Sequence, residues 1–283
     1  MTIDTVVGPA DVLHRLALVV ECVDSVFERR ASTQVRIGRE VSPLLLPAGY
    51  ESSWPCLDLI PRGPGRAMIL FDWRTPTKPV RIRIVDPARR YVARRFELPL
   101  WKLAEIVAAE AAPPMVPAGS RLLRPWLSPG SAYQAATSTT AIRGRVASGG
   151  TAVRWARLTA IGLHPHPQAV GWAHADERGE FLLVIADTGT MSAPFPDELD
   201  IDLKVIAPDP RQAPPVSGDA YADLVVEALP RSANPPAPHD LDNGVLRGRA
   251  QPAGYVANAS AVPQLKVPVG RELALTTDIP FTA

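Results

Sequence analysis

The sequence predicts an all-β protein with two antiparallel β-sandwich modules, a proline-rich linker between them and an extended C-terminal tail. Three observations predict this fold. Short apolar runs with strand-like alternation recur in both halves, separated by turns every ~8–12 residues. The 283 residues include 31 prolines, which interrupt helix interiors and central strands. Hydrophobic residues make up 46% and charged residues 21%, as in globular domains that bury cores of their own.

The first module, residues 12–112, contains the clearest strand pattern. In "VRIRIVD", residues 80–86, the aliphatic Val80, Ile82 and Ile84 alternate with Arg81 and Arg83. This alternation predicts a strand with its arginine face in water. Further strand-like runs cover residues 15–26, 35–38, 48–61, 66–73 and 90–100.

Residues 98–112 are the one good helix candidate of this module. Trp101, Ala104, Ile106 and Ala108 form an approximate helical stripe, and Pro113–Pro114 ends it. A continuation of the preceding strand is the alternative at the start of this range, because Pro99 lies there. A linker rich in Pro, Ser, Gly and Ala follows over residues 113–137. Because it carries isolated anchors such as Trp126, we expect an ordered linker.

The second module, residues 138–230, begins with a hairpin pattern. Arg143 and Arg145 alternate with apolar or small residues, Gly149–Gly150 makes the turn, and residues 152–161 return as a strand. A further strand is predicted at 199–208, where aliphatic residues alternate with polar ones.

The stretch "VGWAHADERGEFLLVI", residues 170–185, predicts a β-hairpin, because a turn separates two strand-like runs. Its turn starts at Asp176 and ends at Gly179, a position where such turns require a positive φ. Asp176 is therefore interpreted as a turn-capping carboxylate rather than a general acid. The second run is apolar on both faces, which predicts a central strand with Phe181 in the core.

The tail, residues 231–283, contains only two strand-like pieces, "GVLRGRAQP" and "QLKVPVGRELALTT". These are too few to bury a core alone, so we expect the tail to dock on this chain or on a neighbour.

The near-neutral total charge of +1 hides an asymmetry. Residues 11–102 hold 16 Lys and Arg against 10 Asp and Glu, a net charge of +6, whereas residues 138–229 hold 7 against 12, a net charge of −5. Two interpretations stay open: electrostatic steering between modules or subunits, and incidental surface charge. The near-neutral total argues against a generic nucleic-acid binder.

Six arginines of the first module are interpreted as a basic face on candidate strands: Arg81, Arg83, Arg89, Arg90, Arg94 and Arg95. Docking of a protein partner and solubility are favoured for this face over phosphate binding.

The chain has two cysteines, Cys22 and Cys56, whose redox state depends on the cellular compartment. The N-terminus lacks the early basic region of a secretory signal, and no apolar run reaches the length of a membrane span. We therefore expect a cytoplasmic protein with two buried, reduced thiols; a disulfide between them is the less favoured alternative.

Three histidines offer the strongest alternative chemistry. His164 and His166 would share a face of a strand, and His174 could lie across the hairpin, a set that suits Zn²⁺ or Ni²⁺. Pro165 and Pro167 instead indicate a turn or sheet edge, so loop histidines are the favoured interpretation. We find no catalytic constellation and expect neither enzymatic activity nor a cofactor.

Part of the second module resembles a known family. In "IRGRVASGGTAVRWARLTAIGLHPHPQAVGWAHADERGEFLLVI" the matching positions are Gly144, Val146, Ala156, Asp176, Gly179 and Phe181. Over residues 138–208 the chain resembles the carboxypeptidase regulatory-like domain, a transthyretin-like sandwich of about seven strands. Residues 15–100 are similar more loosely, through "LVVECVDSVFERRASTQVRI" and "PCLDLIP", but have Phe27–Glu28 where the family has a Thr-Gly turn.

The resemblance implies a stabilising or binding module without catalytic residues of its own. Tandems of such sandwiches also look like accessory components of phage tails and of tail-like contractile injection particles. We therefore expect a non-enzymatic structural or interaction protein in a larger assembly such as a phage tail-like contractile particle assembled in the cytoplasm, with protein partners that include copies of itself. The alternative is a carbohydrate- or metal-binding accessory module of an enzyme complex.

Overall fold

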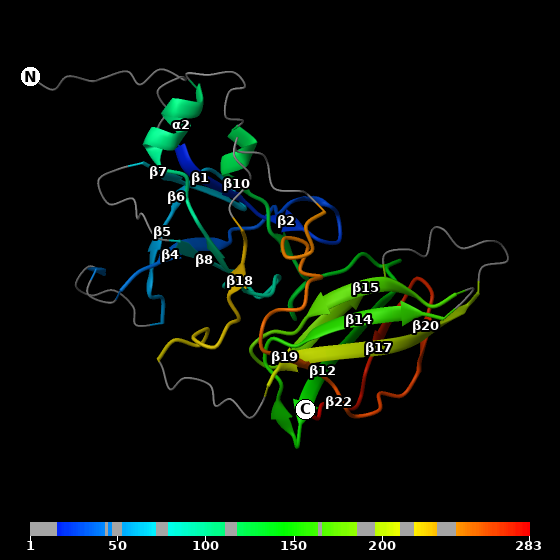
Figure 1. Ribbon diagram of the computed structural model, residues 1–283. Helices are drawn as coiled ribbons and strands as arrows, with labels where there is room; N and C mark the ends of the chain where they lie inside the picture. Colours follow the sequence, from blue (N-terminus) through cyan, green and yellow to red (C-terminus); the bar gives the residue numbers. More distant parts are fainter. Residues whose placement is uncertain are drawn as a thin grey trace, which may run out of the picture.

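The computed structural model of the chain is built mostly from β-strands in several sheets (Figure 1), so the predicted all-β class is confirmed. Among the described residues there is one α-helix, α2 (Leu103–Glu110), and no helix is long and apolar enough to cross a membrane. The structure describes residues 16–42, 45–46, 53–71, 79–110, 118–163, 166–185, 196–209, 218–230 and 242–283.

Three sheets make up the first half of the molecule. The first has the order β10 (Leu122–Leu123), β1 (Leu16–Glu21), β7 (Arg66–Leu70), β6 (Ile60–Pro61). The second has the order β11 (Trp126–Leu127), β2 (Val23–Asp24), β3 (Arg29–Arg30). The third has the order β18 (Glu227–Ala228), β9 (Arg94–Leu98), β8 (Val80–Val85), β4 (Arg36–Glu40), β5 (Cys56–Asp58). Apolar side chains of all three sheets meet in one core, which includes Val20, Ile82, Phe96 and Leu127.

The described part of the predicted linker belongs to these sheets. Strand β10 pairs in parallel with β1, and β11 pairs in parallel with β2. Leu123 and Leu127 are fully buried in the first core. Apolar side chains inserted between strands therefore hold residues 118–137 as a structural part of the first half.

Strand β8 departs from its predicted orientation at one residue. Val80, Ile82 and Ile84 are buried and Arg81 is exposed, as the alternation predicts. Arg83 was expected in water, but its side chain is only 2% exposed. A segment far away in the sequence covers this part of the sheet and supplies the carboxylate of Asp219.

The helix is shorter than predicted and its apolar stripe differs. Residues 94–98 form strand β9, so α2 begins only at Leu103. Trp101 and Ile106 are buried, whereas Ala104 and Ala108 are exposed. The end of the predicted range, residues 111–112, lies outside the described residues.

Two sheets make up the second half, and their apolar side chains share a second core. In the first, β12 (Ala141–Ser148) lies between β13 (Thr151–Ala152) and β16 (Glu180–Val184), and it also pairs with β21 (Glu272–Ala274) and β22 (Ile279–Pro280). The second has the order β15 (Gln168–His174), β14 (Arg157–Gly162), β17 (Glu198–Pro208), β19 (Tyr255–Ala257), with β20 (Leu265–Pro268) also on β17. Gly149 and Gly150 make the predicted turn with positive φ, but the returning strand breaks after β13 and continues as β14 in the other sheet.

The described part of the tail, residues 242–283, docks on its own chain. Strands β19 and β20 pair with β17, while β21 and β22 pair with β12. The piece "GVLRGRAQP" is a series of turns rather than a strand. The second half therefore takes four of its strands from the C-terminal segment (Figure 1).

The stretch at residues 170–185 has the predicted turn but not the predicted pairing. Gly179 has φ 73°, and Asp176 Oδ1 accepts hydrogen bonds from the backbone N–H groups of Arg178 and Glu180. However, β15 pairs with β14 and β16 pairs with β12, so the chain crosses between sheets at this turn. A Cβ on Gly171 would lie 2.7 Å from the Val184 carbonyl oxygen, so the close packing of β15 on β16 requires glycine there.

Strand β16 lies at the edge of its sheet rather than at its centre, yet it is buried on both faces. Phe181 and Leu183 belong to the second core, whereas Leu182 belongs to the first. The first half thus covers the face of β16 that would otherwise meet water, which explains its unbroken apolar run.

Both cysteines are buried free thiols in the first half, as predicted. Burial raises the pKa of Cys56 to about 12 and raises the pKa of Cys22 still further.

Candidate functional site

A groove with a volume of about 380 Å³ lies where the two halves meet. The first half contributes the turn at residues 25–28, Trp126 of β11, and Ser128 and Pro129 after that strand. The second half contributes Gly171 and Trp172 of β15 with Val184 and Ile185 at the end of β16. Arg247 and Arg249 of a C-terminal loop complete the lining.

Arginine side chains stack on aromatic rings around this groove. The guanidinium carbon of Arg247 lies 3.8 Å from the centroid of the Trp126 ring, and that of Arg249 lies 3.9 Å from the Trp172 ring. At the rim, Arg29 stacks on Phe27 at 4.7 Å. Stacking of this kind holds a planar guanidinium in a fixed orientation while its N–H edge stays available for hydrogen bonds.

The loop that carries Arg247 and Arg249 has a defined backbone. Asn243 Oδ1 accepts hydrogen bonds from the N–H groups of Val245 and Leu246 at 2.9 and 3.2 Å, a turn that asparagine favours. Gly248 has φ 72°, and a Cβ there would lie 2.7 Å from ring atoms of His174. Both the conformation and the close approach therefore require glycine between the two arginines.

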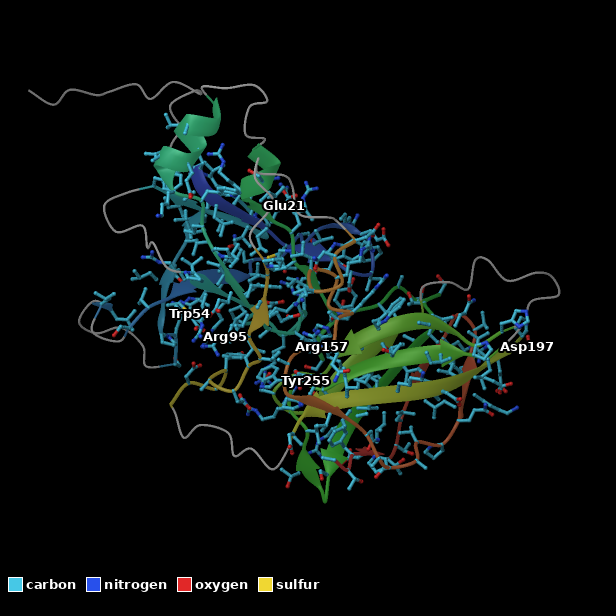
Figure 2. All side chains as sticks on the ribbon, viewed as in Figure 1. Glu21, Trp54, Arg95, Arg157, Asp197 and Tyr255 are labelled. Atoms are coloured by element: carbon cyan, nitrogen blue, oxygen red, sulfur yellow. The ribbon has the colours of Figure 1, made fainter. Side chains whose placement is uncertain are left out.

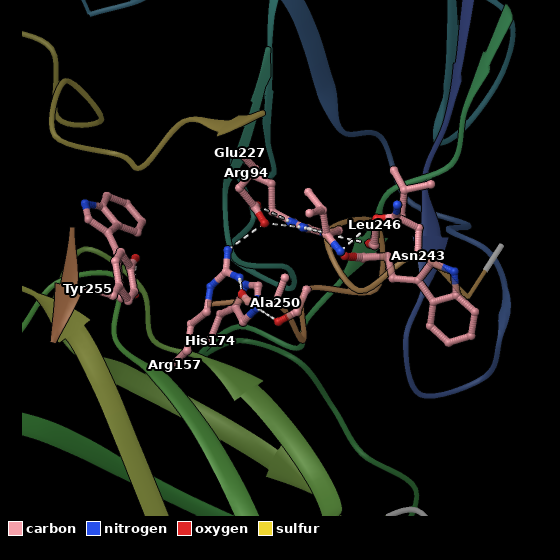
Figure 3. Close-up of polar contacts among 12 residues, drawn as sticks. Arg94, Arg157, His174, Glu227, Asn243, Leu246, Ala250 and Tyr255 are labelled. Atoms are coloured by element: carbon pink, nitrogen blue, oxygen red, sulfur yellow. Dashed lines mark hydrogen bonds and ion pairs between the residues drawn. The ribbon is translucent and has the colours of Figure 1, made fainter. Parts of the chain in front are cut away.

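A buried arginine holds this loop from the first half. Arg94, on β9, is 1% exposed and donates to both carboxylate oxygens of Glu227 at 2.9 and 2.7 Å. Its other N–H groups donate to the backbone carbonyls of Trp126 and Leu246, each at 2.7 Å, and to that of Val245. Figure 3 shows Arg94 extended between Glu227 and Leu246.

The second half holds the same loop through Arg157 and His174. Arg157, on β14, lies 2.6 Å from Glu227 and donates to the carbonyl of Ala250, while His174 Nε2 lies 2.8 Å from the carbonyl oxygen of Gly248 (Figure 3). Burial, with help from the neighbouring arginine charges, lowers the pKa of His174 to about 3, so the ring is neutral near pH 7 and its Nε2–H donates. Four carbonyls of residues 245–250 thus accept hydrogen bonds from buried side chains of both halves.

Opposite charges also hold the segment that leads into β18 against the third sheet of the first half. Arg83 contacts Glu40 and Asp219, each at 2.6 Å, and Arg95 contacts Glu40 at 2.6 Å. Trp54 and Trp155, from different halves, belong to one apolar cluster beside these ion pairs. Figure 2 labels Arg95 and Trp54 in the first half and Arg157 and Tyr255 at the end of the second half that faces it.

The two oppositely charged segments of the sequence form ion pairs with each other within one chain. The positive segment meets the negative one at Arg83–Asp219, Arg94–Glu227 and Arg89–Glu177, the last at 2.8 Å. The predicted basic face is consequently wrong for Arg83, Arg94 and Arg95. Their guanidinium groups are buried or partly buried and contact carboxylates and backbone carbonyls of the same chain. Arg81, Arg89 and Arg90 are exposed.

His166 and His174, two of the three predicted metal ligands, do not come together. His166 is exposed two residues before β15, whereas His174 is buried at the far end of that strand, which by itself spans about 20 Å at ~3.3 Å per residue. His164 lies outside the described residues. Within the described ranges no group of three or more His, Cys, Asp or Glu side chains is arranged to hold a metal ion.

The groove was not predicted from the sequence. Trp126 was expected to anchor the linker, and the loop at 244–252 was expected to be a strand. A signal was present in "DNGVLRGRA": Asn-Gly indicates a turn, and two arginines around a glycine indicate a loop that displays charge.

Chemically, the groove can bind an anion beside apolar surface. Its lining combines two guanidinium groups with Val26, Phe27 and Val184. The buried groups behind it are already engaged with one another, which makes them a support for the loop rather than a reaction centre. No known family model, curated protein or solved structure matches the chain significantly.

Proposed function

We propose that this protein is a non-enzymatic structural and interaction protein that serves as a rigid component of a larger assembly. One observation carries the proposal: buried ion pairs from both halves converge on Glu227 and fix the arginine loop of the groove. A chain whose buried charges join its parts and support a surface groove suits a component that holds a partner. The described tail contributes to the same rigidity, because its strands complete both sheets of the second half.

We further infer that the sheets form two transthyretin-like sandwiches. In the first half, strands β1 and β8 belong to different sheets and contribute to one core. In the second half, β12 and β14 do the same. The resemblance of residues 138–208 to carboxypeptidase regulatory-like domains supports this arrangement. By fold-level analogy alone, it also makes a phage tail-like contractile particle the assembly to test first.

Sedimentation of a lysate from the native host tests this proposal. We expect the chain in particle-sized fractions, together with the tube and sheath proteins of a contractile particle, and we expect these fractions to lose it when the particle is dissociated. A chain found only as a free monomer would contradict the proposal. Co-sedimentation with a hydrolase would instead favour the accessory-module alternative.

A further inference from the structure

We propose that the groove between residues 25–28 and β15 receives an acidic segment of a protein partner, whose carboxylates bind Arg247 and Arg249. This inference rests on the proposed function, since it names the chemistry by which an interaction protein would hold its partner. Four observations support it: the local charge, the geometry of the guanidinium groups, the support behind the loop and the nature of the remaining lining.

The groove has more positive than negative side chains. Arg247 and Arg249 line it and Arg29 stacks on the lining residue Phe27, whereas the carboxylates that act on Arg249 are Glu28 and Asp242. Asp242 contacts Arg247 at 2.6 Å, and among the described residues no carboxylate lies in ion-pair contact with Arg249. Partial burial and the positive charge of Arg247 lower the pKa of Arg249. A bound anion would offset the repulsion between the two arginines.

The geometry suits carboxylates. Each of the two loop guanidinium groups lies on an indole ring at 3.8–3.9 Å, which fixes its plane. Arg247 also contacts Asp242, so we expect the bidentate carboxylate contact at the N–H edge of Arg249. The loop itself is held by Arg94, Arg157 and His174, so binding would not have to order it. A site prepared in this way loses little affinity to conformational entropy.

A peptide fits the lining better than a sugar or a nucleic acid. Stacked arginines already cover one face of Trp126 and one face of Trp172, which leaves less aromatic surface on which a sugar ring or a base could stack. The rest of the lining includes Val26, Val184 and Phe27, which is 48% exposed, so apolar side chains could pack beside the carboxylates. The volume of about 380 Å³ lies within the ~300–1,000 Å³ range of small-ligand pockets and suits a short extended segment.

Calorimetric titration of the full chain with a synthetic peptide tests the inference. The probe is acetyl-Glu-Leu-Glu-Leu-Glu-amide, with the matching Gln peptide as its uncharged control. We expect the Glu peptide to bind at least about 10-fold tighter, and less tightly as salt rises from about 0.05 to 0.5 M, because salt screens the contact. Arg249→Gln should weaken binding about 5- to 20-fold, Arg249→Lys less, and the double variant with Arg247→Gln should abolish it.

Arg81→Gln is the matched control, because Arg81 is exposed on β8 and lines no part of the groove. It should bind the Glu peptide like the wild type, and unchanged melting temperatures would show that every variant is folded. Equal affinity for the two peptides, or unchanged binding by Arg249→Gln, would overturn the inference. Tighter binding of tripolyphosphate or of a cello-oligosaccharide than of the Glu peptide would overturn it as well.

Sedimentation of the double variant separates this inference from the proposed function. Loss of the variant from particle-sized fractions that contain the wild type supports both. If the variant still enters those fractions, the groove is not the docking site but the proposed function stands. If the wild type never enters such fractions, the proposed function fails, and the peptide titration alone decides the chemistry of the groove.

Discussion

Replacing Glu227 with glutamine removes one charge from the network that joins the two halves while keeping the size of the side chain. The carboxylate accepts from Arg94 at 2.9 and 2.7 Å, and Arg157 lies 2.6 Å away. Its side chain is 4% exposed. In the Glu227→Gln variant, two buried guanidinium groups would lose their common counter-charge.

The expected cost follows from the pKa of Glu227. Burial by itself would raise this pKa, but Arg94 and Arg157 outweigh burial and lower it from 4.5 to about 2. At 1.36 kcal/mol per pKa unit, the charged form is favoured by about 3 kcal/mol in the folded chain. Breaking a buried ion pair costs about 3–5 kcal/mol in other proteins. We therefore expect the variant to lose about 3 kcal/mol of unfolding free energy at pH 7.

Urea unfolding at several pH values measures this loss, with Glu198→Gln at the exposed start of β17 as the control, expected to cost less than about 0.5 kcal/mol. Because the folded pKa lies below the unfolded one, the stabilisation is present above about pH 4.5 and is lost as pH falls toward 2. The difference between wild type and variant should narrow over this window. A loss below about 1 kcal/mol at pH 7, or a difference that stays constant down to pH 2, would refute the argument.

Four further predictions concern the core, the buried histidine, the tail and metal binding. Phe181→Ala should cost about 3–5 kcal/mol in a urea titration, because the ring is fully buried, whereas Phe27→Ala at an exposed site should cost far less. Burial and the neighbouring arginines lower the pKa of His174 to about 3, so between pH 6.5 and about 3 only the unfolded chain binds a proton at this residue, and the melting temperature falls as the pH falls. His174→Gln should make this fall less steep; an unchanged slope would contradict the argument. Deleting residues 242–283 should abolish the cooperative thermal transition of the second half in circular dichroism, unlike an independent tail, whose removal would leave it intact. Zn²⁺ should leave the melting temperature unchanged, because His166 and His174 are at opposite ends of β15; a rise that His174→Gln removes would show a site.

Local patterns predicted most strands correctly where one face meets the core and the other meets water. Val80, Ile82 and Ile84 are buried as predicted, and so are Ile201, Leu203 and Val205 of β17. The turn at Asp176–Gly179 was also predictable, because its side-chain acceptor and its positive φ depend on residues next to one another.

The same patterns failed where a distant segment changes the environment of a strand. Arg83 has the sequence neighbours of an exposed residue, but Asp219 covers and neutralises it. Strand β16 has the composition of a central strand, yet it lies at a sheet edge that the first half covers. Local alternation does not contain this information, since the covering residues are distant in the sequence: Asp219 is 136 positions from Arg83, and β16 is covered by strands of the first half.

By itself, the sequence determined that this chain is all-β, where most of its strands and turns lie, and that its two cysteines are buried. These properties depend on the pleat, on turn chemistry and on apolar content, which act over a few neighbouring residues. Only the tertiary structure decided that the tail completes the second half, that the opposite charges of the two segments pair within one chain, and that Trp126, Trp172, Arg247 and Arg249 share a groove. Those outcomes depend on which surfaces the folded path brings together, because a buried charge is stable only beside a partner that the chain delivers from far away.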